Sequence, residues 1–215
     1  MTVLEIALPN LKKDPVLIRE GMKGLIPSLV TNLKKSGLLN GMQGFFATED
    51  GRDISDECKE VLLLEWPTTQ HFQDFIASPG FLAFAGEVKE KYAVGPPELK
   101  LFEVGSEVSS LFGSETILEY IIVKVKDDSE AGVQSVLQKL QSGLSQLGTS
   151  KVAVRKSSNL PTQEIAIVSL YASDAELETA KASTARQQLL ADVANAADLT
   201  SLVAHVKNVR TLTEE

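Results

Sequence analysis

The residues best suited to chemistry lie in one short stretch, where a tryptophan ends an apolar run and a histidine follows. Trp66 ends the run that begins at Val61, and His71 lies one turn into an expected helix. Histidine exchanges protons most readily near neutral pH, so His71 is the candidate catalytic residue and Trp66 a candidate ligand contact. Two alternatives stay open: His71 falls at the edge of the helix's buried stripe and faces solvent, and Trp66 only packs at the strand end.

Aromatic residues concentrate in the first half of the chain and predict a ligand pocket there. Trp66, Phe75, Phe81 and Tyr92 are the candidate ligand-binding residues, because aromatic walls suit a flat, largely apolar molecule. The alternative is that the rings only fill the core. The first half holds Phe45, Phe46, Trp66, Phe72, Phe75, Phe81, Phe84, Tyr92 and Phe102, whereas the second half proper holds only Tyr120 and Tyr171.

Two glutamates occupy equivalent places in an internal repeat. Thr2-Val3-Leu4-Glu5 returns 114 positions later as Thr116-Ile117-Leu118-Glu119. Each glutamate could supply its half with a carboxylate base, or it could pair with a cation at a barrel seam, because buried charges need partners. The partner of Trp66 in the second half is Tyr171 if the strands align through their ends, and Leu170 if they align through Glu60 and Glu164.

The repeat predicts that one folding unit occurs twice, each time as strand, helix, strand, strand, helix, strand. In the first copy, helical periodicity begins at Asp14-Pro15, is kinked or broken at Pro27 and stops near Gly37. Thr68 or Thr69 caps the next helix and Ser78-Pro79 restarts it. Strands are expected at 3–8, 42–48, 58–66 and 99–104.

The second copy follows the same order. Asp128 is expected to cap a helix that ends at Gly148, and Ser173 with Glu176 forms a capping box for one long helix reaching about Ala197. Strands are expected at 151–156, 164–171 and 202–209, after the first near Thr116. The two units are then 1–105, which holds the pocket, and 115–215, which is a degenerate copy. A linker over 106–114 joins them.

Composition excludes several classes of protein. The 215 residues carry a net charge of -8, which argues against nucleic acid or an anionic membrane surface as partner. Cys58 is the only cysteine, so no intrachain disulfide or cysteine-based metal cluster forms, and a reducing, cytoplasmic setting fits. No phosphate-binding loop, nucleophile elbow or zinc signature is found, the two histidines are too separated for a metal site, and no apolar run reaches membrane-spanning length.

The stretch from Leu64 to Phe81 (LEWPTTQHFQDFIASPGF) resembles the dimeric alpha-beta barrel superfamily, especially its antibiotic biosynthesis monooxygenase-like and stress-responsive branches. The shared features are a tryptophan that ends the third strand and a later Ser-Pro-x-Phe in the second helix. The resemblance implies an α+β fold in which two tandem ferredoxin-like (βαββαβ) units form one dimeric-type alpha-beta barrel within the chain.

The resemblance also implies a function in secondary metabolism: binding, and transforming without a cofactor, a small aromatic or polyketide-like molecule by oxygenation or cyclisation. Cyclase members carry a tyrosine and a histidine where this chain has Phe75 and Phe81, and haem-degrading relatives carry a histidine where Ala85 stands. Phenylalanine cannot exchange a proton. The alternative is therefore a non-catalytic barrel, a ligand carrier or a stress-type assembly protein. No metal or other cofactor is expected, and a further homodimer stays open.

Overall fold

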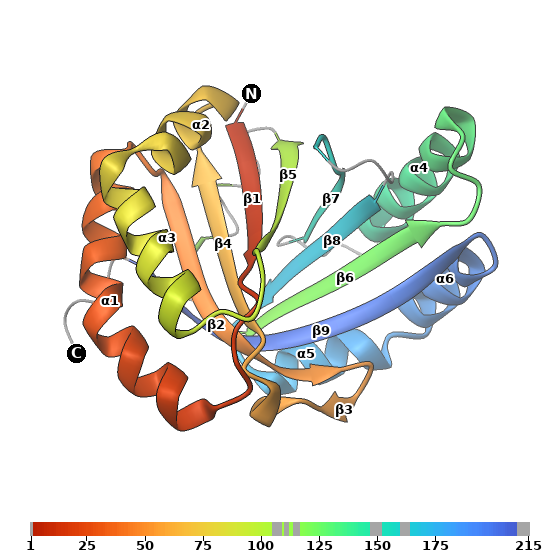
Figure 1. The fold of residues 1–215 in the computed structure, drawn as a ribbon. Helices are drawn as coiled ribbons and strands as arrows, with labels where there is room; N and C mark the ends of the chain where they lie inside the picture. Colours follow the sequence, from red (N-terminus) through yellow and green to blue (C-terminus); the bar gives the residue numbers. More distant parts are fainter. Residues whose placement is uncertain are drawn as a thin grey trace.

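In the computed structural model, the described strands form one curled antiparallel sheet with helices on its outer face (Figure 1). The structure describes residues 2–104, 109, 112–113, 117–146, 152–159 and 164–209, so most of the expected linker, and Gly148, lie outside the described residues. The first half contains β1 (Thr2–Leu8), α1 (Pro15–Lys35), β2 (Asn40–Glu49), β3 (Arg52–Asp53), the short 3-10 helix Ser55–Glu57, β4 (Glu60–Trp66), α2 (Thr69–Ala77), α3 (Pro79–Lys91) and β5 (Glu98–Val104).

Over its described residues, the second half repeats the order of the main elements without a counterpart of β3. It contains β6 (Ile117–Val125), α4 (Glu130–Gln146), β7 (Val152–Lys156), β8 (Glu164–Tyr171), α5 (Asp174–Ala182), α6 (Thr184–Ala194) and β9 (Ala197–Asn208). The strand order is β5-β1-β4-β2 in the first half and β9-β6-β8-β7 in the second. If the four main strands of each half are numbered in chain order, leaving out β3, both halves have the spatial order fourth, first, third, second.

The halves join where β2 pairs with β9 over seven residue pairs, from Met42↔Asn208 to Glu49↔Leu202. The two outer strands of the sheet, β5 and β7, also approach each other, and a single bridge links Phe102 with Ser157. Inside the curl, buried side chains from both halves form one apolar cluster that includes Leu63, Phe102 and Val168. The interior of the curled sheet is therefore a packed core.

Helices α1–α3 cover the outer face of the first half and α4–α6 that of the second (Figure 1). Alternation along β4 explains both layers, because Val61 and Leu63 face the interior of the curled sheet while Leu62 and Leu64 face the helices. None of the described helices is long and apolar enough to cross a membrane.

Helix α1 continues through Pro27, so of the two alternatives expected there, a kink or a break, the break does not occur. Two expectations about helix ends are wrong. Ser129, not Asp128, caps α4, since its hydroxyl accepts from the backbone N–H of Gly132 at 3.1 Å. The long helix expected after Ser173 is two helices, because the extended residue Ser183 ends α5 and its hydroxyl caps α6 at Arg186 N.

Candidate functional site

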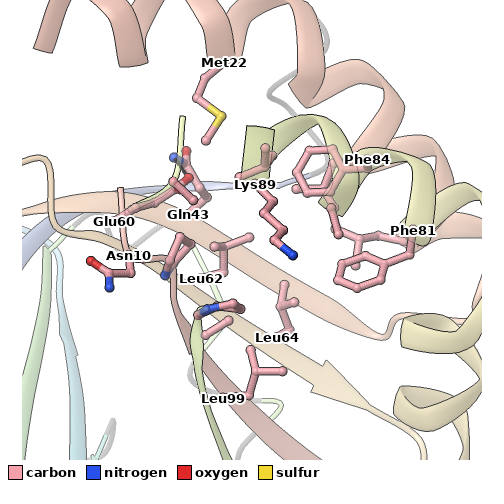
Figure 2. A pocket seen from close by; sticks show the side chains of 18 of the residues that line it. Asn10, Met22, Gln43, Glu60, Leu62, Leu64, Phe81, Phe84, Lys89 and Leu99 are labelled. Atoms are coloured by element: carbon pink, nitrogen blue, oxygen red, sulfur yellow. Dashed lines mark hydrogen bonds between the residues drawn. The ribbon is translucent and has the colours of Figure 1, made fainter. Parts of the chain in front are cut away.

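A cavity of about 550 Å³ lies between the outer face of the first-half sheet and helices α1 and α3 (Figure 2). Strands β1, β2, β4 and β5 supply its floor, and the two helices supply its roof. Its wall is mostly carbon, because strand alternation turns apolar side chains toward the helices. The floor includes Glu5, Ala7, Gln43, Glu60, Leu62, Leu64 and Leu99, and the roof includes Met22, Ile26, Leu29, Val30, Leu33, Phe81, Phe84, Ala85, Val88 and Lys89.

Two glycines let α1 approach α3 closely at both ends of the roof. A Cβ on Gly21 would collide with the ring of Tyr92, and a Cβ on Gly80 would collide with the amide of Asn32. At the rim, the backbone N–H of Val94 donates to Asn10 O at 2.8 Å. These contacts hold the roof in place while the middle stays open.

Glu5 is a buried carboxyl with one oxygen fixed and the other facing the cavity. Trp66 Nε1 donates to Glu5 Oε2 at 2.7 Å, and Oε1 accepts no hydrogen bond from the described residues. Across those residues the only enclosed side-chain nitrogen or oxygen without a partner is Nη1 of Arg186, so Glu5 Oε1 borders open space. Burial raises the pKa of Glu5 to about 7, opposed in part by the Trp66 hydrogen bond.

A second buried carboxyl, Glu60, shares this cavity with an amide. Gln43 Nε2 donates to Glu60 Oε1 at 2.8 Å. Burial raises the pKa of Glu60 to about 7, while the bond from Gln43 lowers it. Two carboxyl groups that titrate near neutrality therefore face one apolar cavity.

Lys89 is the only cationic side chain among the described residues that line the cavity. Its ammonium group projects into the space between the Glu60–Gln43 pair and the rings of Phe81 and Phe84 (Figure 2). No described carboxylate forms an ion pair with it, so its charge is available to a ligand.

Four of the five sequence-predicted site residues lie in the wall of the cavity or directly behind it. Phe75 and Phe81 line the cavity, with ring centroids 4.6 Å apart. Trp66 is fully buried behind Glu5 and stacks on Phe75 at 5.0 Å. Tyr92 packs on Gly21 and holds the roof without lining the cavity.

His71 lies apart from this cavity. Its Nδ1 is 2.9 Å from Thr68 Oγ1, and it lines a separate surface hollow with Lys35, Gly37 and Asp74. The helical stripe predicted that edge position, and Phe72 and Phe75 are the buried residues of α2.

Sequence reasoning missed Glu60 and Gln43 as site residues. The signal was present for Glu60, because it shares strand alternation with Leu62, Leu64 and Trp66. Gln43 gave no comparable signal, since β2 is buried on both faces over Gly41–Gly44.

The second half fills the corresponding place with a buried ion pair. Val3 pairs with Trp66 and Ile117 pairs with Tyr171, so Tyr171, not Leu170, is the counterpart of Trp66. Tyr171 Oη donates to Glu119 Oε2 at 3.0 Å, and Arg186 Nη2 donates to the same oxygen at 2.6 Å.

Arg186 is the counterpart of Phe81. Ser78 caps α3 through the N–H of Phe81, and Ser183 caps α6 through the N–H of Arg186. A guanidinium therefore neutralises Glu119, while its equivalent, Glu5, faces a cavity.

No protein-family model matches the sequence, and no curated protein matches it. Solved structures do match over nearly the whole chain. A protein described as a "putative monooxygenase" from Fusobacterium nucleatum has a TM-score of 0.69 at 9% identity, covering 96% of this chain and 93% of its own. An anthrone oxidase-like protein has a TM-score of 0.57 at 13% identity, covering 97% and 93%. A haem-binding protein from Thermus thermophilus has a TM-score of 0.56 at 12% identity, covering 100% and 96%.

The chain has the fold of the dimeric alpha-beta barrel superfamily. The residues that line the α1–α3 cavity do not fit haem. Haem iron takes histidine, cysteine or tyrosine as an axial ligand, or methionine together with histidine. The described residues that line the cavity include none of the first three. Nor does the described part of this barrel bring three histidine, cysteine, aspartate or glutamate residues together in a metal-binding arrangement.

Proposed function

We propose that this chain consists of two ferredoxin-like units in tandem, residues 1–105 and 115–215, joined by 106–114. The matching element orders and strand orders of the two halves support this reading. The strand pairing supports it too. Val3 and Ile117 are 114 residues apart, as in the sequence repeat, and each pairs with the last residue of a strand, Val3 with the end of β4 and Ile117 with the end of β8. On this reading, one chain closes a barrel that single-unit relatives close by dimerising.

We propose further that the first unit binds a small aromatic or polyketide-like molecule in the α1–α3 cavity and oxygenates it without a cofactor. The observation that carries this proposal is Glu5, a buried carboxyl fixed by Trp66 whose other oxygen faces an apolar cavity. A general base works best when its pKa lies near the working pH, and the pKa of Glu5 is raised to about 7.

In this mechanism Glu5 Oε1 takes a proton from an activated CH₂ group of the ligand and leaves a carbanion conjugated with the ring. The carbanion transfers an electron to O₂, and the two radicals combine to a peroxide, which accepts a proton. Loss of water from the peroxide, with departure of the second C–H proton, leaves a carbonyl. The net reaction is CH₂ + O₂ → C=O + H₂O. The apolar walls exclude bulk water during these steps.

The remaining predicted residues take supporting roles in this proposal. Phe75 and Phe81 hold the flat rings of the ligand. Trp66 acts as a positioning residue, because its indole N–H fixes the Glu5 carboxyl. Tyr92 keeps the roof closed against Gly21.

The experiment uses anthrone, which carries one activated CH₂ between aromatic rings. Purified protein is expected to speed its conversion to anthraquinone over the buffer rate, with one O₂ consumed for each product molecule. Glu5→Gln is expected to lose at least 100-fold in kcat, the size of a typical general-base contribution. His71→Ala is expected to keep full turnover, because His71 lies outside the cavity.

Other outcomes of this experiment would each support a different function of the protein. Loss of turnover in His71→Ala with activity intact in Glu5→Gln would return the proton transfer to His71. Binding without oxygen uptake would favour the ligand carrier, and a rearranged product without oxygen uptake would favour a cyclase.

A further inference from the structure

The cavity has a second polar place, at a distance from Glu5 along the floor. Glu5 lies opposite Leu64 in the β1–β4 register, and Glu60 lies four residues before Leu64 on β4. Four residues of strand span about 13 Å. A ligand that reaches from Glu5 to Glu60 must therefore be longer than a single ring.

The groups at this second place are buried and still face the cavity. Glu60 is 5% exposed and Gln43 is 9% exposed. Their one mutual hydrogen bond uses Gln43 Nε2 and Glu60 Oε1. Glu60 Oε2 and Gln43 Oε1 accept nothing from the described residues and are not enclosed, so both border the cavity that these residues line.

The chemistry of this pair favours an uncharged partner. Burial raises the pKa of Glu60 to about 7, so its carboxyl is substantially protonated near neutrality and can donate a hydrogen bond, while Gln43 Oε1 can accept one. A cationic ligand group would lie near the ammonium of Lys89, which projects into the same cavity (Figure 2), and like charges repel there. A hydroxyl or carbonyl group avoids this repulsion and can pair with both the Glu60 carboxyl and Gln43 Oε1.

We propose that Glu60 and Gln43 form a second polar subsite, which hydrogen-bonds a hydroxyl or carbonyl group at the end of the ligand far from Glu5. The ligand is then an elongated molecule of several rings with polar groups at both ends. This inference rests on the proposed function of the cavity and adds the class of molecule that it selects.

The test compares two ligands that differ only in the far polar group: 2-hydroxyanthraquinone and 2,6-dihydroxyanthraquinone. Both have the same three rings, and neither carries the CH₂ that oxygenation consumes. Their Kd values are measured at pH 6 by calorimetry. Quenching of Trp66, the only tryptophan, reports occupancy beside Glu5.

The native protein is expected to bind the dihydroxy compound about tenfold more tightly, which is the effect of one good buried hydrogen bond. Glu60→Leu is expected to abolish this preference while changing the Kd of the monohydroxy compound less than twofold. Glu60→Gln keeps a donor and should retain most of the preference. Gln43→Leu removes the other polar group of the subsite and is an independent test. Thermal melting verifies that each variant is folded.

Equal binding of the two compounds by the native protein would overturn the subsite and leave the cavity function standing. A preference that survives in both Glu60→Leu and Gln43→Leu would do the same. Failure of both compounds to bind at all would overturn the proposed function together with the subsite.

Discussion

The carboxyls of Glu5 and Glu60 are costly to ionise where they lie, because the described residues give each only one hydrogen bond and no cation in contact. Glu119, the counterpart of Glu5, has Arg186 and Tyr171 on one oxygen. The difference between the halves is therefore a difference in how a buried carboxyl is compensated. A site that works by proton transfer would use Glu5, the carboxyl that no cation compensates.

We expect stability to fall as pH rises from about 5 to 8. The pKa of both Glu5 and Glu60 is raised from 4.5 to about 7, so the folded state binds more protons than the unfolded state over this range. The contribution of each protonated carboxyl to the free energy of unfolding is about 3 kcal/mol. It is fully present below pH 4.5 and is lost as pH rises through 7. Denaturant unfolding at pH 5 and pH 8 measures the change. The double variant Glu5→Gln, Glu60→Gln should lose most of this slope, and an unchanged slope would show that other groups cause it.

Arg186→Ala is expected to destabilise the protein by about 3 to 5 kcal/mol, because it leaves the Glu119 carboxylate buried without its cation. Replacing both partners, as Arg186→Leu with Glu119→Leu, should recover most of that loss. Chemical unfolding of the single and double variants gives the comparison. A double variant as unstable as the single one would mean that packing, and not the uncompensated charge, sets the cost.

At the scale of elements, the paired short helices of each half set what its outer face can hold. Ser78 and Ser183 restart the chain at equivalent points, and the third residue after each is Phe81 in one half and Arg186 in the other. An aromatic ring at that point lines an open cavity, whereas a guanidinium reaches the strand carboxylate. The residue type at this helix position, phenylalanine or arginine, is therefore one of the differences between the halves.

The close approach of α1 and α3 depends on Gly21, and we expect Gly21→Ala to destabilise the protein by about 1 to 3 kcal/mol, since the new methyl collides with Tyr92. Gly24→Ala is the matched control in the same helix. Nothing lies within 4 Å of its added Cβ, so higher helix propensity should stabilise by up to about 1 kcal/mol. Thermal melts compare the two variants. Equal effects would show that the helices are not in contact at Gly21.

Local signals in the sequence were sufficient for most elements. Apolar periodicity and the caps at Asp14, Thr68 and Ser78 give the starts of α1, α2 and α3 nearly to the residue. The break at Ser183 was missed because the alanine-rich segment around it has high helix propensity on both sides. The site was harder to predict: Phe75 and Phe81 follow from aromatic content and Glu60 from alternation along β4, but Gln43 joins the same cavity only through the pairing of β2 with β4.

At the scale of the whole molecule, the two halves share one interior and cannot be separated without exposing it. The cluster inside the curled sheet draws Leu4, Phe46 and Ile54 from one half, and Leu118, Tyr120 and Leu202 from the other. A buried ion pair between Lys100 and Glu164, at 2.7 Å, also crosses between the halves. Tyr120 donates to the same carboxylate at 3.0 Å.

We therefore expect Gly44→Ala to lower the midpoint of unfolding without splitting the transition. The added methyl would collide with the carbonyl of His205 across the β2–β9 pair, at a cost of about 1 to 3 kcal/mol. Far-UV and near-UV circular dichroism should still follow one cooperative curve. Gly86→Ala, with nothing within 4 Å of its Cβ, is the control. Two separated transitions would mean that the halves unfold independently.

The β2–β9 pairing also affects how the chain folds while the ribosome synthesises it. Met42 pairs with Asn208, so β2 leaves the ribosome long before its neighbour has been synthesised. At roughly 5 to 20 residues per second, the delay is on the order of 10 to 30 s. During that time the nascent chain carries an unpaired strand edge and the apolar side chains of Phe46 and Leu63, which are later buried inside the barrel. Such edges recruit other strands, so the presence of chaperones that bind nascent chains should raise the yield of folded protein.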